Sequence, residues 1–224
     1  TAQPRVRTME YTVEGPGLKL RGGAVLDPRG DGTWSLAAAE IDLAQWFDWI
    51  APQLGSAAEG LKFSGLLALS GAGTWREGAM GGQMAVTLRE GRLEDPAHKL
   101  LVEGLAGAAT IEDLRTFRTA PAQGLTWRGG HYDVIAIGPG RLEFAFDRES
   151  LRVNGAVISL LGGELQAGSL VLSLTQPEFA ITAEVRGIDL GKILFLLPPV
   201  LAEAQGRLDG WIALRRDSAG VDTE

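Results

Sequence analysis

Apolar and polar residues alternate along most of this chain in short runs, and this alternation constrains the fold more than any other feature. Leu142, Phe144 and Phe146 are interleaved with Arg141 and Glu143, and similar runs recur about every 8–12 residues between turns rich in Gly, Pro and Asp. A period of two places the apolar side chains of a strand on one face of a sheet. No long helical pattern separates the runs, so we expect a mainly β, antiparallel meander of roughly a dozen short strands rather than βαβ units.

A long internal repeat interrupts this alternation. The stretch Ile41–Leu69 returns as Ile188–Leu214, and both copies open with Ile-Asp-Leu. Apolar positions at helical spacing recur at one offset of 147 residues. They are Leu43, Trp46, Phe47, Ile50 and Leu54 in the first copy, and Leu190, Ile193, Leu194, Leu197 and Leu201 in the second. Such a period is too long for a short solenoid repeat, so residues 1–224 are expected to form a single fragment of large repeated units.

Each copy is predicted to contain a short amphipathic helix followed by a strand. In the first copy, Asp42 can be assigned as the N-cap and Gln45 as the residue that completes a capping box. Ile41 and Trp46 can be assigned as a hydrophobic staple pair. Pro52, and Pro198-Pro199 in the second copy, should end or kink the helices within about three turns. Strands are expected at Leu61–Leu69 and Arg207–Leu214.

Three segments rich in turn-forming residues are predicted to be turns that divide the strands: Ser70–Gly73, Glu90–Pro96 and Gly138–Gly140. Two short helices are too little to cover the strands, so the partner of the apolar strand faces is the central question. The alternation alone allows either an ordinary closed core or an open apolar surface. The residues expected to form this surface are Leu142, Phe144, Phe146, Leu151, Val153, Leu170, Leu172, Leu174, Phe179 and Ile181.

Charge and composition argue against several classes of function. The net charge is −7 and no basic run occurs, which argues against a nucleic-acid partner. The chain has no cysteine, so disulfides and thiolate metal sites are excluded. The longest apolar run, Ile193–Leu197, ends at Pro198 and is far shorter than the roughly 20 residues of a membrane-spanning helix. Any targeting or anchoring segment is expected to lie outside this sequence.

No group of residues typical of catalysis, cofactor binding or metal binding stands out. The two histidines, His98 and His131, lie in turn-like surroundings without a marked nucleophile or carboxylate partner. No pair of carboxylates can be placed in a cleft, as a glycan-cleaving enzyme would require. Turn carboxylates such as Asp27 and Asp95 are more readily explained as solvated groups than as calcium ligands. We therefore expect no enzymatic activity, no cofactor and no metal.

Several motifs of small and apolar residues carry a family likeness over residues 102–214. They are VEGLAG at 102–107, IEDL at 111–114, LLGGEL at 160–165, and a closing segment at 185–214 that contains IDL and GRLDG. With these motifs the chain resembles the AsmA-like superfamily of bacterial envelope proteins, related to TamB-type proteins, and above all its YdbH branch. The C-terminal region of that branch carries the label of a dicarboxylate-transport domain, but no Arg or Lys cluster here suggests a carboxylate clamp.

The resemblance implies an elongated, taco-like β-groove with an apolar inner face. It also implies the periplasmic part of an inner-membrane-anchored protein that passes phospholipids between the inner and outer membranes. The implied partners are phospholipid acyl chains, together with envelope membrane proteins at the ends of the full-length chain. The alternative is a structural or interaction β-domain with a closed core, which would bind a protein partner through an edge strand or a helix face.

Overall fold

The computed structural model describes residues 6–54, 58–173, 179–194, 205–217 and 220–223. Within these residues, sixteen strands form one sheet. The first half contains β1 (Arg7–Gly15), β2 (Leu18–Leu26), β3 (Gly32–Asp42), α1 (Leu43–Ile50), the 3-10 helix η1 (Ala51–Leu54), β4 (Lys62–Arg76), β5 (Ala79–Asp95) and β6 (Leu100–Asp113). The second half contains β7 (Arg118–Thr119), β8 (Gln123–Trp127), β9 (Gly129–Tyr132), β10 (Ile135–Phe146), β11 (Ser150–Leu160), β12 (Gly163–Ala167), β13 (Leu170–Ser173), β14 (Phe179–Asp189), α2 (Leu190–Leu194), β15 (Arg207–Asp217) and β16 (Gly220–Thr223).

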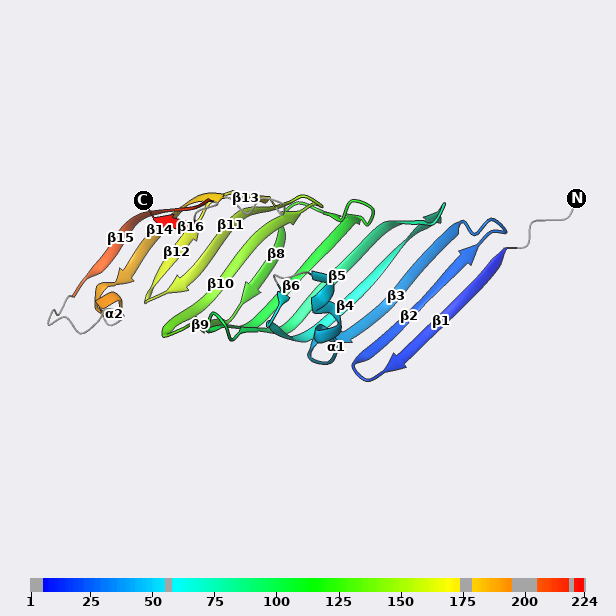
Figure 1. Ribbon diagram of the computed structural model, residues 1–224, viewed down its shortest axis with the longest axis horizontal. Helices are drawn as coiled ribbons and strands as arrows, with labels where there is room; N and C mark the ends of the chain where they lie inside the picture. The colour runs from blue at the N-terminus through cyan, green and yellow to red at the C-terminus, as the bar shows by residue number, and fades with distance from the viewer. Residues whose placement is uncertain (1–5, 55–57, 174–178, 195–204, 218–219, 224) are drawn as a thin grey trace, which may run out of the picture.

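The sheet is an antiparallel meander in which neighbours in space are nearly always neighbours in sequence. Its main path runs β1-β2-β3-β4-β5-β6-β8-β10-β11-β12-β14-β15-β16, while β7, β9 and β13 pair beside it. Figure 1 shows the strands side by side along one long axis, with β1 at one end and β15 at the other. The prediction of a mainly β, antiparallel fold with two short helices is confirmed.

This sheet has no second layer in the described part of the chain. The two helices lie along the same long edge of the sheet (Figure 1). The accessible surface is 14,975 Å², against the roughly 9,900 Å² expected of a compact globular protein of this mass. No large side chain among the described residues is fully buried. The hydrophobic residues therefore gather on a sheet surface rather than in a closed core.

The two copies of the repeat fold alike where the structure describes both. Each begins with a strand, β3 or β14, that ends in an aspartate and leads directly into a helix. The Asp42 N–H donates to the carbonyl oxygen of Gly17 at 2.7 Å, and the Asp189 N–H donates to that of Leu161 at 3.1 Å. Both acceptors lie at the end of a neighbouring hairpin, so each helix is fixed to the same edge of the sheet. Leu197, Leu201 and Pro198-Pro199 lie outside the described residues.

The predicted cap of α1 is confirmed, but the capping box is wrong. The Asp42 carboxylate accepts the Ala44 N–H at 3.0 Å. Gln45 does not accept the Asp42 N–H, which is already bonded to Gly17, and instead donates its side-chain amide to the Asp42 carboxylate at 3.0 Å. In the second copy the Asp189 carboxylate accepts the Gly191 N–H at 2.9 Å. Helix α1 ends at Ile50, shortly before Pro52.

The three predicted turns are wrong, because a continuous strand crosses each segment. Strand β4 passes through 70–73, β5 continues to Asp95 with only Pro96 in a turn, and β10 passes through 138–140. A Cβ on Gly71 would lie 2.5 Å from the carbonyl oxygen of Gln83 on β5, so glycine permits close strand pairing there. The other two segments contain bulges, between Leu88 and Gly91 and between Ile137 and Gly140.

Candidate functional site

An unbroken ladder of apolar residues crosses the sheet from end to end. Residues paired directly across neighbouring strands project from the same face, so the strand register assigns each side chain to a face. From β1 to β15, twelve successive partners along this ladder are Gly, Ala, Leu or Ile. They are Gly15, Leu18, Ile41, Leu67, Leu88, Gly107, Leu125, Leu142, Ala156, Ala167, Ala183 and Ile212. We call the surface that carries this ladder the apolar face.

Further apolar rows run beside this ladder on the same face. One row joins Val13, Leu20, Ala39, Leu69, Val86 and Ala109 across β1 to β6. Another joins Phe144, Val153 and Leu170 across β10, β11 and β13. Most of these side chains are half-buried because neighbours on adjacent strands crowd them, while Val13 on the edge strand is 47% exposed. The apolar face is therefore broad, continuous and reachable from outside.

Eight of the ten residues predicted to form the apolar surface have described side chains, and the register brings all eight onto the apolar face. They are Leu142, Phe144, Phe146, Leu151, Val153, Leu170, Leu172 and Ile181. Phe146 pairs with Leu151, which pairs with Leu172, so three strands bring these residues together. Leu174 lies outside the described residues, and so does the side chain of Phe179.

The predicted set covers only the C-terminal half of this face. Leu18, Ile41, Leu67 and Leu88 continue the same ladder through the N-terminal half. Their strands alternate in the same way, so the signal was present in the sequence. Glycines and bulges obscured this signal, because they interrupt the alternation of apolar and polar residues within a strand while the pairing between strands continues.

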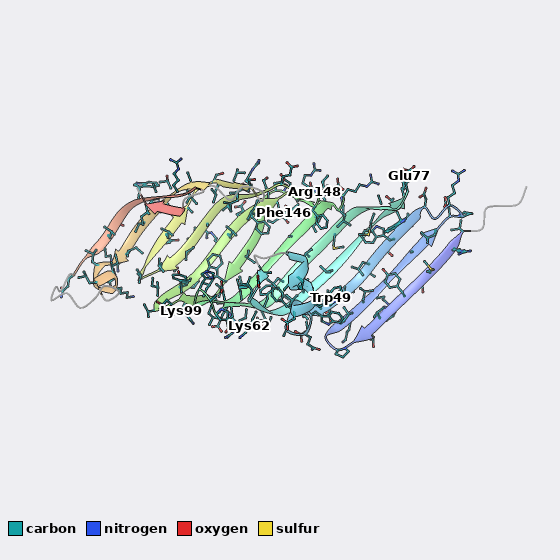
Figure 2. The ribbon with its side chains drawn as sticks, viewed as in Figure 1. Trp49, Lys62, Glu77, Lys99, Phe146 and Arg148 are labelled. Carbon is teal, nitrogen blue, oxygen red and sulfur yellow. The ribbon has the colours of Figure 1, made fainter. Side chains whose placement is uncertain are left out.

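The opposite face and the long edges carry the polar residues. Glu14, Lys19 and Glu40 pair in succession across β1, β2 and β3. Arg92 on β5 and Glu103 on β6 form an ion pair with 2.5 Å between nitrogen and oxygen. In Figure 2, Lys62 and Lys99 lie along one long edge of the sheet, and Glu77 and Arg148 lie along the other. The molecule is thus a two-sided sheet, and only one side is apolar.

Helix α1 covers a small part of the apolar face near one edge. Leu43 and Phe47 are buried, and the Phe47 ring meets the Phe63 ring of β4 edge-on with 5.6 Å between centroids. Phe63 belongs to the apolar face, since it pairs with Leu93. Trp49 points away and is 70% exposed. One short helix therefore shields one section of the face and leaves the rest uncovered by described residues.

The titratable side chains highlighted by the sequence have structural roles. Asp95 accepts hydrogen bonds from the His98 ring at 2.6 Å and from two backbone N–H groups, and these bonds, led by the His98 ring, hold the pKa of Asp95 below its usual value. Asp27 accepts the N–H groups of Arg29 and Asp31 within its own turn. His131 lies in strand β9, not in the turn-like surroundings expected of it. Among the described residues, no three His, Asp or Glu side chains gather as metal ligands would.

Comparison with known proteins gives one match. The family model of the YdbH-like proteins, described as intermembrane phospholipid transport protein YdbH, matches residues 19–222, a wider region than residues 102–214 on which the resemblance rested. No curated protein and no solved structure matches the chain. Among the helices described, none has the length and apolar character needed to span a membrane. Because the family model matches almost the whole chain, this protein belongs to the YdbH-like family of intermembrane phospholipid transport proteins.

Proposed function

We propose that the apolar face holds the acyl chains of phospholipids while they pass between the inner and outer membranes. The observation that carries this proposal is the apolar ladder from Gly15 to Ile212, which crosses the sheet without a polar interruption. Transfer of an acyl chain from water to such a surface gains about 25 cal/mol per Å² of apolar area buried. This interaction is non-directional, so a chain can slide along the ladder without losing a specific contact.

The sheet acts as one wall of a groove in this proposal. Bulges bend a strand and increase its twist. They occur in β3, β5, β6, β10, β11 and β14, and this distribution supports a sheet that curves about its long axis. Acyl chains lie on the apolar face inside the groove, with Leu142, Phe144 and Leu172 among the residues lining it. Charged headgroups remain at the polar edges. The protein performs no chemistry of its own on the lipid.

The cellular setting follows from the same proposal. The chain is the periplasmic part of a protein anchored in the inner membrane by a segment outside this sequence. Membrane proteins of the envelope contact the ends of the full-length protein. The alternative, a closed-core interaction domain, needs a second layer over the apolar face, and among the described residues the short helix α1 is the element that packs on it.

Native mass spectrometry of the purified protein, followed by organic extraction and lipid identification, tests the proposal. We expect phospholipid to co-purify, or to bind when the protein is incubated with vesicles of phosphatidylethanolamine and phosphatidylglycerol. A protein that is purified without lipid and takes up none from these vesicles would contradict the proposal and favour a closed-core interaction domain.

A further inference from the structure

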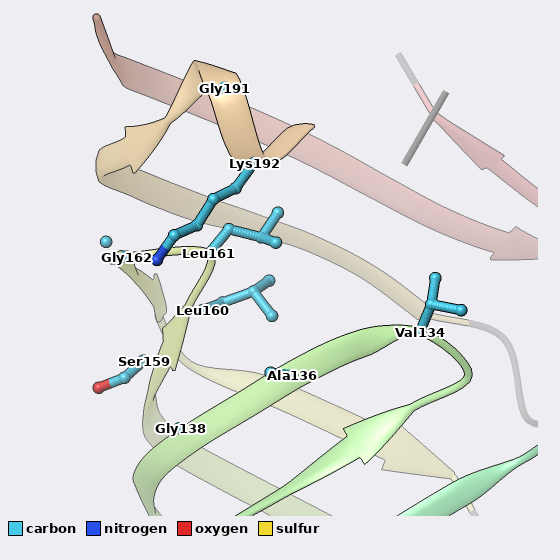
Figure 3. Close-up of a pocket in the computed structure, with 10 residues that line it drawn as sticks. Val134, Ala136, Gly138, Ser159, Leu160, Leu161, Gly162, Gly191 and Lys192 are labelled. Atoms are coloured by element: carbon cyan, nitrogen blue, oxygen red, sulfur yellow. The ribbon is translucent and has the colours of Figure 1, made fainter. Parts of the chain in front are cut away.

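An open cavity lies where helix α2 meets the β11–β12 hairpin. It has a volume of about 810 Å³, which is within the range of ligand pockets. Leu160, Leu161, Val134 and Ala136 form much of its wall, and Lys192 of α2 lies at its rim. Figure 3 shows the Lys192 side chain extending from α2 to Gly162 at the hairpin turn, close to Leu160 and Leu161. An apolar wall and one cation thus meet at the edge of the sheet.

The cavity touches the apolar face through Leu160 at the edge of the sheet. Ala136 and Ser159 also line it and lie on the opposite face, because they neighbour the paired residues Ile137 and Leu160. Leu160 alternates along β11 with Ile158 and Ala156, and Ala156 is a member of the apolar ladder. An acyl chain that lies on the ladder can therefore extend to Leu160 without crossing polar surface. The end of that lipid which bears the headgroup would then reach the rim of the cavity, where Lys192 is placed.

Lys192 has no structural partner in the described part of the chain. Neither a hydrogen bond nor an ion pair joins its ammonium group to any described residue. The neighbouring Asp189 carboxylate accepts the N–H of Gly191 as the helix cap. A Cβ added to Gly162 would lie 3.1 Å from the Lys192 Nζ, so the ammonium lies directly over the hairpin turn. The cation is available to an anionic group from outside.

The first copy of the repeat shows that the fold does not need a cation at this position. Gln45 occupies the position in the first copy that Lys192 occupies in the second. A Cβ added to Gly17 would lie 2.9 Å from the side-chain amide of Gln45. The Gln45 amide donates to the capping Asp42 carboxylate, so a neutral residue fills the position and is satisfied within the protein. The positive charge of Lys192 is therefore an addition that the helix and hairpin do not require.

We infer that this cavity is a headgroup site, in which Lys192 binds the phosphate of a phospholipid whose acyl chain lies on the apolar face. The inference rests on the proposed function. The ammonium supplies charge-assisted hydrogen bonds to phosphate oxygens, and the apolar wall of the cavity strengthens them relative to bulk water. Transport along a uniform apolar ladder has no preferred stopping place, and a single cation at the edge would create one.

Two lipids with identical chains separate the phosphate contact from acyl binding: dioctanoyl phosphatidylglycerol and dioctanoylglycerol. Affinities are measured by native mass spectrometry for the wild type, Lys192→Gln and Lys192→Arg. Lys192→Gln reproduces the residue of the first copy and should fold. Lys19→Gln, on the polar face, serves as the control, because Lys19 likewise bonds no described residue.

We expect the wild type, Lys192→Arg and Lys19→Gln to prefer the phosphate-bearing lipid by about fivefold, as for a solvent-accessible charge pair. Lys192→Gln should lose this preference while its affinity for dioctanoylglycerol is unchanged. A preference that survives in Lys192→Gln, or that is absent in the wild type, overturns the headgroup site alone. A wild type that binds neither lipid overturns the proposed function as well. Inorganic phosphate in excess should not displace the lipid; full displacement would mean a site for free phosphate instead.

Discussion

A single aspartate fixes the start of each helix at the edge of the sheet. The Asp42 carboxylate accepts the Ala44 N–H and also the Gln45 amide, so two donors depend on it. We expect Asp42→Ala to lower the free energy of unfolding by about 1 kcal/mol, the usual value of an N-cap. Urea denaturation measures the change. Asp48→Ala is the matched control, since Asp48 is an exposed carboxylate of the same helix that bonds no described residue. Equal stability of the two variants would show that the cap contributes nothing.

The turn between β10 and β11 depends on a carboxylate whose charge can be removed by acid. The Asp147 carboxylate accepts the N–H of Glu149 at 3.0 Å, and the hydroxyl and N–H of Ser150 at 3.0 and 2.8 Å. These bonds, led by the Glu149 N–H, favour the charged form and lower the pKa of Asp147. A lowered folded-state pKa gives stability that is complete above the ordinary carboxyl pKa and is lost as the pH falls through the folded value.

The lowered pKa of Asp147 determines how the stability of the Asp147→Asn variant should depend on pH. At pH 7 the variant should be less stable than the wild type, because Asn lacks the charge. At a pH below the ordinary carboxyl pKa of about 3.9 the difference should shrink, because the wild-type carboxyl also becomes protonated as the pH falls. Urea denaturation at both pH values measures the effect, with Asp48→Asn as the control. A difference that stays constant with pH would contradict the role of the charge.

At the scale of a strand, adjacent residues of β10 belong to opposite faces and provide a matched pair of variants. Phe144 pairs with Val153 on the apolar face, and Ala145 pairs with Arg152 on the polar face. We expect Phe144→Glu to abolish most lipid binding while the protein stays folded, because an open face leaves the new carboxylate in contact with water. Ala145→Glu should bind lipid like the wild type. Leu172→Glu on β13 should repeat the Phe144→Glu result.

Circular dichroism measures whether the Phe144→Glu and Ala145→Glu variants are folded, and a lipid-binding assay measures whether they still bind lipid. If the apolar face were instead the inside of a closed core, Phe144→Glu would bury an unpaired charge and unfold the protein. Loss of binding with a preserved β spectrum therefore supports the open face, and loss of the β spectrum contradicts it. Equal lipid binding by Phe144→Glu and the wild type would remove Phe144 from the lining.

Strands could be predicted from the sequence more reliably than their ends. Leu18–Leu26 alternates and is flanked by turn residues, and it is β2. Gly138-Pro139-Gly140 has the same composition as a turn, yet it lies within β10 as a bulge. The difference depends on whether a neighbouring strand continues past the segment, as β11 does with Ile158 and Leu160. That information is not local, so composition alone misassigns bulges as turns.

At the scale of the whole molecule, the sequence predicts which side chains share a face of the sheet but not what covers that face. Alternation in β10 predicts that Leu142, Phe144 and Phe146 share a face, and it does not say whether another layer covers that face. The strand register supplies this missing information. It places Leu142 in a row that runs through ten strand pairings from Leu18 to Ile212. All these residues belong to one sheet, which has no second layer among the described residues. From the sequence, Lys192 is only the residue at the position that Gln45 holds in the first copy, since its place at the rim of a cavity depends on a hairpin about thirty positions earlier.

An open sheet and a closed domain of the same length differ in size in solution, and small-angle X-ray scattering measures that difference. A compact domain of 224 residues has a radius of gyration of roughly 17 Å. Thirteen strands on the main path, spaced about 4.8 Å apart, already span nearly 60 Å along one axis, and strand length adds to the second axis. We expect a radius clearly above that of the compact domain and a skewed distance distribution, constant over a dilution series. A value near 17 Å would mean that the sheet closes on itself in solution, so that the apolar face would be a core and not a surface for lipid.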